Sequence, residues 1–232
     1  YLRQGKSDIV NRTEVIFHFN APHFHIICYL CAMKVDKVTI VGSGNVAEAF
    51  ARALKAASIE VVQLFARNRE RGEFVASLAG CEFCSEPDKL KAADLYLLCV
   101  SDRAIAEVAA SLPFSSGAIV AHTAGCGTLE MLPQGVNRAI IYPFQTFSAG
   151  RVVDFSKIFL FIEAADSQTY DKATAFAKCL SQNVRAADAA LREKIHLTGV
   201  LTSNFVNNMY ATATEVLTDA ALDFDVIAPI IA

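Results

Sequence analysis

The 232-residue sequence has no uninterrupted apolar run of the roughly 18 residues that a membrane-spanning helix needs, so it predicts no such helix and no membrane partner. It also has no run of basic residues, and 21 lysines and arginines against 24 aspartates and glutamates give a net charge of −3. Nucleic-acid binders usually carry a basic patch, so nucleic acid is not an expected partner. With 53% hydrophobic residues and no internal repeat, the chain is typical of a globular protein with a sizeable core.

The cysteines do not form the pattern of a disulfide framework. Their number, seven, is odd, and they lie in apolar segments, which favours reduced thiols in a cytoplasmic protein. Two pairs have the C-x-x-C spacing of many zinc sites: Cys28 with Cys31, and Cys81 with Cys84. We expect no metal, because the second pair frames a short strand; a zinc site that uses the histidines just before Cys28 is the alternative.

Residues 1–32 match nothing that follows them. The stretch from Phe17 to Cys31 is aromatic and rich in histidine, but Asn20 and Pro22 interrupt it, unlike the apolar core of a signal peptide. Met33 then stands directly before a strand. We therefore expect residues 1–32 to be an extension upstream of the natural start at Met33; a genuine N-terminal arm is the alternative.

From Lys37 onward, short β-rich runs alternate with helical stretches. We expect strands at 38–41, 61–65, 94–100, 118–121, 139–142 and 158–162, and helices at 45–57, 71–78, 105–112 and 167–180. Strands that alternate with helices predict βαβ units. The sequence therefore predicts an α/β fold whose first part, residues 33–186, is a Rossmann-type domain with a mostly parallel sheet.

The strand pattern stops near Ala186, and residues 187–222 predict one long helix or two helices with a break. Apolar residues recur there at spacings of four and three, in a stripe made of Leu197, Leu201, Phe205, Met209, Ala213 and Val216. We expect residues 187–232 to be part of an all-α domain for substrate binding and dimerisation. The apolar, uncapped end suggests that this domain is truncated. So long an apolar stripe predicts a homodimer.

A phosphate-binding turn follows the first strand. Gly42-Ser43-Gly44-Asn45-Val46-Ala47 has the pattern G-x-G-x-x-A between a strand and a helix, a context that makes the motif specific. The first glycine permits the tight turn, the second lets the backbone approach a pyrophosphate, and the alanine lets the helix pack closely. We expect Ser43, Asn45 and Val46 to contact the cofactor too, since the helix N-terminus presents free N–H groups.

The end of the second strand indicates which dinucleotide binds. An NAD enzyme usually has Asp or Glu there to bind the ribose 2′-hydroxyl. This chain has Arg67-Asn68-Arg69, and guanidinium groups match the oxygens of a 2′-phosphate. The sequence therefore predicts NADP as the cofactor.

The chain resembles a family of predicted oxidoreductases that join a Rossmann-like domain to a C-terminal helical domain of unassigned function. The matching stretches are VTIVGSGNVAEAFARAL, ADLYLLCVSD, AIVAHTAG, YPFQTFS and REKIHLTGVLTSNFVNNMY, which span most of residues 37–232. The family is similar to pyrroline-5-carboxylate reductases, ketopantoate reductases and 3-hydroxyacid dehydrogenases. The resemblance implies an NADP-linked reductase whose site lies between the two domains.

The chain departs from these relatives at two positions. Tyr142-Pro143 stands where a His-Pro pair is expected. In ketopantoate reductases, a catalytic lysine precedes two asparagines, and an alignment on Asn204 and Asn208 puts Val200 at the lysine position. Their mechanism therefore cannot be transferred whole to this chain.

Ligands in open α/β sheets bind outside the carboxyl ends of the strands. That rule points to residues 100–102, 122–125 and 143–146, so we expect Val100 and Ser101 at the cofactor and Thr123 and Pro143 at the substrate. His122, at one strand end, is the first candidate for a general acid, and a structural hydrogen bond is its alternative role.

His196, early in the long helix, is the second candidate acid. At about 100° per residue it shares a helix face with Ser203 and Asn207, while Asn204 lies closer to the apolar stripe. We expect Asn204 and Asn207 to orient the substrate, because an amide does not titrate.

Three functions fit these observations. The first is an NADP(H)-dependent oxidoreductase that acts on a small carbonyl, hydroxy-acid or imine substrate. The second is a non-catalytic NADP(H) sensor, which the missing lysine favours. The third makes the helical half mainly an assembly module, and the fold alone does not choose among them.

Overall fold

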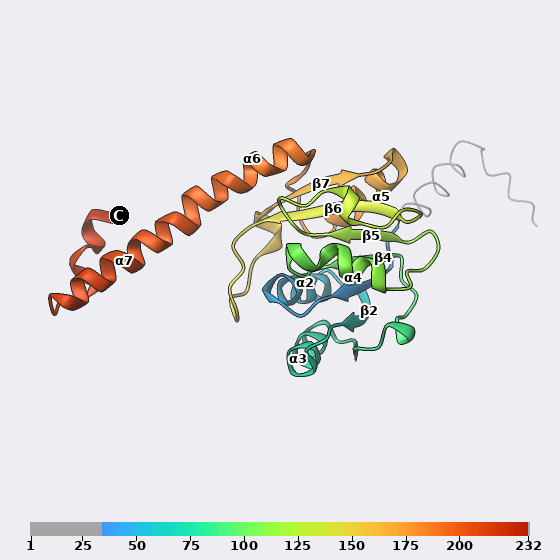
Figure 1. The fold of residues 1–232 in the computed structure, drawn as a ribbon, viewed down its shortest axis with the longest axis horizontal. Coiled ribbons are helices and arrows are strands. Elements are labelled where there is room, and N and C mark those ends of the chain that lie inside the picture. Colours follow the sequence, from blue (N-terminus) through green and yellow to red (C-terminus); the bar gives the residue numbers. More distant parts are fainter. Residues whose placement is uncertain (1–33, 232) are drawn as a thin grey trace, which may run out of the picture. The chain divides into compact units, whose positions relative to one another are not determined.

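The computed structural model of the protein describes residues 34–231. The Cys28/Cys31 pair and the expected start at Met33 lie outside these residues. Within them, strands and helices alternate up to the last strand, and only helices follow (Figure 1).

One eight-stranded sheet runs through the described residues, in the order β3-β2-β1-β4-β5-β6-β7-β8. The strands are β1 (Lys37–Val41), β2 (Glu60–Phe65), β3 (Glu82–Cys84), β4 (Leu95–Leu98), β5 (Ile119–His122), β6 (Asn137–Phe144), β7 (Phe159–Ala164) and β8 (Val184–Ala186). Neighbouring strands are parallel except β6 and β7, which are antiparallel. The predicted α/β fold is confirmed.

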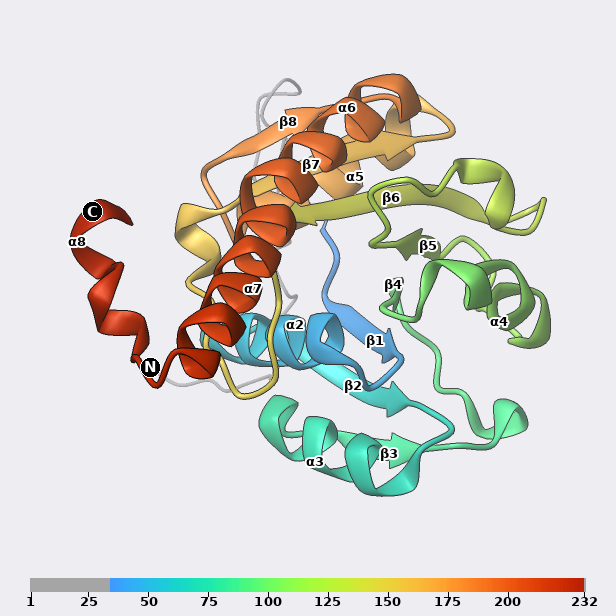
Figure 2. The same ribbon diagram turned by 60° about the vertical axis from the view of Figure 1, so that its left-hand side comes forward.

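The helices cover both faces of this sheet. They are α2 (Asn45–Ala56), α3 (Arg69–Ala79), α4 (Ile105–Ser111), α5 (Ser167–Lys178), α6 (Ala189–Gly199), α7 (Phe205–Asp219) and α8 (Ala228–Ile231). Short 3₁₀ turns are η1 (Pro87–Lys89), η2 (Asp102–Ala104), η3 (Leu129–Met131), η4 (Phe155–Lys157) and η6 (Phe224–Val226). Figure 2 shows α4 and α6 on one side of the sheet and α2 and α5 on the other.

Side chains alternate along each strand and build a core on each face. Leu97 of β4 packs with Phe50 of α2 and Phe176 of α5 in one core, whereas its neighbour Leu98 packs with Ile105 of α4 in the other. Farther along the second face, Tyr142 of β6 packs with Ile195 of α6. The sheet therefore lies between two helical layers, and the loops that follow its strands lie at the edge of both.

After β8, residues 189–219 form one continuous helical run with an irregular turn. Residues Val200–Asn204 form a π-turn, η5, between α6 and α7, with the Phe205 N–H donating to the Val200 carbonyl. The sequence left open one helix or two with a break, and the structure shows one run without a break. None of the α7 residues is buried. Among the described helices, none is both long and apolar enough to cross a membrane.

Candidate functional site

A cavity of about 370 Å³ lies at the carboxyl ends of β1, β2 and β4. This is the point where the strand order reverses, the usual dinucleotide site of such sheets. Most of the residues expected at the cofactor line it: Gly42, Ser43, Gly44, Arg67, Asn68, Val100 and Ser101. The loops that sequence reasoning chose therefore meet around one cavity.

The glycine turn has the geometry that a pyrophosphate needs. Gly42 has φ +114°, and a Cβ there would lie 2.5 Å from the Cys99 carbonyl oxygen. At Gly44 a Cβ would meet nothing within 4 Å, so this side of the turn is open to a ligand. Ala47 is fully buried, and no side chain caps the N-terminus of α2. The turn and the free N–H groups of this helix end thus fit a bound dinucleotide.

The two arginines after β2 lie in different surroundings. Arg67 lines the cavity. Arg69 is not among the lining residues: it forms an ion pair with Glu73 at 2.9 Å and lies 5.5 Å from the centre of the Phe83 ring. The structure therefore brings Arg67, and not Arg69, to the cavity.

The remaining expected cofactor contacts have partners within the protein. Asn68 caps α3 by accepting a hydrogen bond from the Arg71 N–H at 3.0 Å. The Asn45 amide donates to the Phe147 carbonyl at 3.1 Å, and Val46 packs against the core. Neither Asn45 nor Val46 lines the cavity with its side chain, which leaves their backbone N–H groups for a phosphate.

A second cavity, of about 280 Å³, lies between the end of β6 and the helical run. Its lining residues are Tyr142, Phe144, Gln145, Thr146, His196, Gly199, Val200, Thr202, Ser203 and Asn204. This volume is close to the lower limit of roughly 300 Å³ for small-molecule sites, so the cavity suits a small substrate. We call it the β6–α6 cavity.

Two titratable side chains meet in the wall of the β6–α6 cavity. The Tyr142 hydroxyl lies 3.1 Å from His196 Nδ1. Burial, helped by the nearby Cys126 and Asp102, raises the pKa of Tyr142 to about 12. The phenol is therefore neutral near neutral pH and shares a hydrogen bond with the imidazole, in which the tautomer of His196 sets the donor.

The π-turn decides which asparagine reaches this cavity. The i to i+5 hydrogen bond widens the helix locally, so fewer degrees separate successive residues than in the regular helix that the sequence argument assumed. As a result, Asn204 and Ser203 line the cavity together with His196, whereas Asn207 is exposed and is not among the lining residues. The hydroxyls of Ser203 and Thr146 lie 3.1 Å apart and join the helix to the segment after β6.

His122 lies in neither cavity. It is fully buried, its Nε2 lies 3.2 Å from the Thr128 carbonyl oxygen, and its Nδ1 accepts a hydrogen bond from the Ala124 N–H at 3.2 Å. Burial lowers the pKa of His122 to about 4. Of the two roles that the sequence left open for this residue, these contacts favour the structural one.

The two other expected substrate residues are also packed inside. The Thr123 hydroxyl donates to the Leu98 carbonyl at 3.3 Å, and Pro143 is a buried residue within β6. Sequence reasoning gave no role to Tyr142, which it noted only where a histidine was expected. Strand alternation offered the missing signal: Tyr142 lies on the same face of β6 as Ile140, and α6 covers that face.

Two family models match the chain. The one described as NADP oxidoreductase coenzyme F420-dependent matches residues 37–124, and the one described as a domain of unknown function, DUF2520, matches residues 158–232. None of the curated proteins compared with the chain matches it.

Solved structures match the chain over a larger share of its length than either family model. A protein from Bacteroides fragilis that is assigned as an NADP oxidoreductase is 33% identical, with 86% of this chain and 78% of that chain covered and a TM-score of 0.79. An imine reductase from a Pseudomonas species is 17% identical over 85% and 72% of the two chains, with a TM-score of 0.62. A pyrroline-5-carboxylate reductase from Coxiella burnetii is 14% identical over 84% and 75%, with a TM-score of 0.59. The last two show a common fold.

Proposed function

The chain belongs to the family of NADP oxidoreductases in which a Rossmann domain precedes the DUF2520 helical domain, and we propose that it acts on a small carbonyl, hydroxy-acid or imine substrate in the β6–α6 cavity. One observation carries the proposal: the Tyr142 hydroxyl and the His196 imidazole meet in the wall of that cavity.

The two cavities suit the two reactants. The loops after β1, β2 and β4 would hold NADP(H), and the end of β6 with α6 would hold the substrate. Strands β1, β4, β5 and β6 are parallel neighbours, so their carboxyl ends lie along one edge of the sheet. When bound, the nicotinamide supplies or accepts the hydride, and the protein supplies orientation and a proton.

Tyr142 and His196 are the titratable side chains among the lining residues of the β6–α6 cavity. Reduction of a carbonyl or imine leaves a basic oxygen or nitrogen that takes up a proton. The Tyr142 hydroxyl donates it, His196 Nδ1–H returns a proton to the phenolate, and His196 Nε2 takes up a proton from solvent, so that both side chains end as they began. Val200, at the position of the ketopantoate reductase lysine, also lines the cavity, so this pair takes over the role of that amine.

Neutral polar groups would orient the substrate. The Asn204 amide, the Gln145 amide and the Ser203 hydroxyl line the same cavity and can bind the atoms next to the reacting carbon. Asn207 has no place in this arrangement, because it lies beyond the π-turn and is not among the lining residues.

The test is turnover of NADPH with a panel of small ketones, oxo acids and cyclic imines. For an accepted substrate, Tyr142→Phe and His196→Asn should each lower kcat by roughly 10²–10⁴-fold while the Kd of NADPH stays unchanged. His122→Asn is the matched control, because it changes a histidine outside the cavity. If His122→Asn loses turnover and the other two variants do not, the acid is His122 instead.

A non-catalytic NADP(H) sensor is the second candidate function, and the apolar Val200 in the cavity wall favours it. A sensor would bind NADPH and a small ligand but would turn over no member of the panel. Binding of a panel compound without NADPH oxidation, unchanged by Tyr142→Phe, would select this alternative.

The stripe on the helical run supports a homodimer. Leu201, Phe205, Met209 and Val216 are exposed, each by half or more of its surface. A row of exposed apolar side chains of this kind is typical of a protein interface. We propose that a second copy of the chain covers it.

A further inference from the structure

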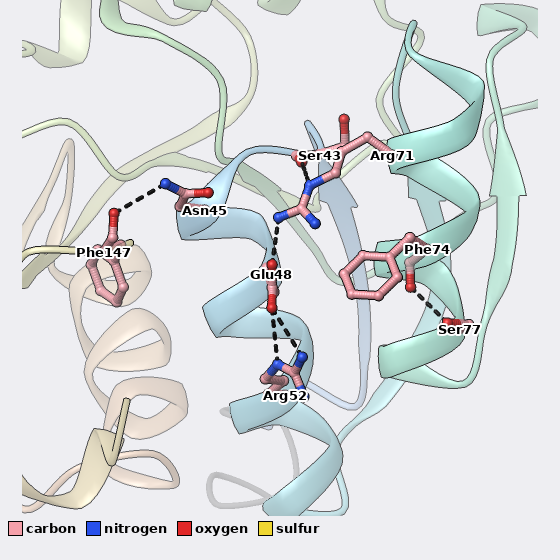
Figure 3. A network of polar contacts seen from close by, with 8 residues as sticks. All are labelled: Ser43, Asn45, Glu48, Arg52, Arg71, Phe74, Ser77 and Phe147. Atoms are coloured by element: carbon pink, nitrogen blue, oxygen red, sulfur yellow. Dashed lines mark hydrogen bonds and ion pairs between the residues drawn. The ribbon is translucent and has the colours of Figure 1, made fainter. Parts of the chain in front are cut away.

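Arg71 joins the two loops that line the dinucleotide cavity. It lies in the first turn of α3, and its side chain reaches the turn between β1 and α2 (Figure 3). Its Nε donates a hydrogen bond to the Ser43 carbonyl at 3.1 Å, and its backbone N–H donates to the Asn68 side chain at 3.0 Å. One residue thus contacts both the turn that fits a pyrophosphate and the loop that begins with Arg67.

Glu48 holds the Arg71 guanidinium in place. Glu48 is 3% exposed; one carboxylate oxygen accepts from Arg71 Nη2, and the other accepts from Arg52 Nε at 3.2 Å and Nη2 at 2.9 Å. Burial alone would raise the pKa of Glu48, but the hydrogen bonds and charges of Arg71 and Arg52 outweigh it and hold the pKa below its ordinary value. The carboxylate is therefore ionised, and its contacts fix the orientation of the guanidinium.

The three arginines of this segment have three different environments. Arg67 lines the cavity, and Arg69 pairs with Glu73 on the exposed side of α3. Arg71 is two residues, or about 200°, farther around the helix than Arg69, and its guanidinium packs 4.9 Å from the centre of the Phe74 ring. Of the two arginines on α3, only Arg71 contacts the glycine turn.

We propose that Arg71 is a positioning residue for the phosphate-binding turn. By holding the Ser43 carbonyl, it keeps residues 42–44 in the conformation that aims the N–H groups at the start of α2 toward a pyrophosphate. It acts through the turn, whereas Arg67 pairs with the 2′-phosphate. NADPH and NADH share the pyrophosphate, so loss of Arg71 weakens both equally, while loss of Arg67 weakens NADPH selectively.

The experiment titrates NADPH, NADH and adenosine 2′-phosphate into the protein and four variants. We expect Arg71→Ala to raise the Kd of both dinucleotides by about tenfold with their ratio unchanged, and to leave adenosine 2′-phosphate binding unaltered. Arg67→Ala should raise the Kd of NADPH and of adenosine 2′-phosphate about tenfold and that of NADH little. Arg69→Ala, on the same helix, is the control and should change none of them.

Two results would overturn the proposal: unchanged affinities in Arg71→Ala, or a loss confined to NADPH, which would make Arg71 a reader of the 2′-phosphate. Arg71→Gln is the milder variant, because its amide can still donate to the Ser43 carbonyl although it removes the charge and the Nη2 contact with Glu48. It should lose less affinity than Arg71→Ala for both dinucleotides, and a loss confined to NADPH would again contradict the proposal. Because these are binding measurements, they hold whether or not the protein reduces a substrate.

Discussion

His122 is held in its neutral form by burial, and this makes folding stability depend on pH. Its pKa is about 4 in the folded protein and 6.5 in the unfolded chain. Below pH 6.5 the unfolded chain therefore binds a proton that the folded protein does not, so stability is full above this pH and falls as the pH drops toward 4. The loss reaches at most about 3 kcal/mol.

The check is the free energy of urea unfolding at pH 7 and at pH 4.5, for the protein and for His122→Asn. We expect the variant to lose distinctly less stability between the two pH values, because asparagine does not titrate and all other groups are common to both proteins. An identical pH dependence in the two proteins would show that His122 is not held neutral.

Some residue roles could be predicted from the sequence alone, and others could not. The roles of Gly42 and Gly44 were predictable, because a tight turn before a helix places local demands on the backbone. The preference for His196 over His122, and its pairing with Tyr142, was not, because both depend on contacts between segments far apart in the chain. They depend on the loop after β5, which brings the Thr128 carbonyl to His122, and on α6, which brings His196 to Tyr142.

Among the elements, most strands and helices lie where the sequence pattern predicts them, because buried strands are continuous apolar runs. The pattern did not predict β8, a three-residue edge strand with no apolar run, or the antiparallel direction of β7, which depends on a long connection from β6. It also could not predict the π-turn, since one hydrogen-bond shift leaves no mark in the composition of residues 200–204.

The loop after β5 packs directly beneath the Tyr142–His196 pair. A Cβ at Gly125 would lie 2.8 Å from His196 Nδ1 and 2.9 Å from Tyr142 Cζ. We therefore expect Gly125→Ala to separate the two side chains and to lower kcat by at least about tenfold, with the Kd of NADPH unchanged. Steady-state kinetics with an accepted substrate would measure the effect.

Cys126→Ala, the next position in the same loop, is the control for this substitution, because Cys126 is exposed. It should leave kcat close to that of the unaltered protein. Full activity in Gly125→Ala would contradict this prediction. It would mean that turnover does not need the hydrogen bond between Tyr142 and His196.

For the whole molecule, the exposed stripe of α7 predicts assembly in solution. Phe205 and Met209 are exposed by 55% and 69%, an unusual state for two large apolar side chains on one helix face. Sedimentation should show a dimer, and Phe205→Lys with Met209→Lys should shift it toward the monomer. Thr214→Lys, an exposed change on the same helix away from the stripe, should leave the dimer intact. A monomer at all concentrations of the unaltered protein would reject the assembly.

We propose a single reaction site along the carboxyl edge of the sheet, with the cofactor after β1, β2 and β4 and the substrate between β6 and α6. A crystal structure of the protein with bound NADPH tests it most directly. We predict that the nicotinamide ring lies at the mouth of the β6–α6 cavity, with its reactive carbon within about 3.5 Å of a position that a substrate carbon can occupy while its oxygen or nitrogen contacts the Tyr142 hydroxyl. A nicotinamide ring that lies away from Tyr142 and His196, with protein between it and the cavity, would show that the two cavities do not form one reaction site.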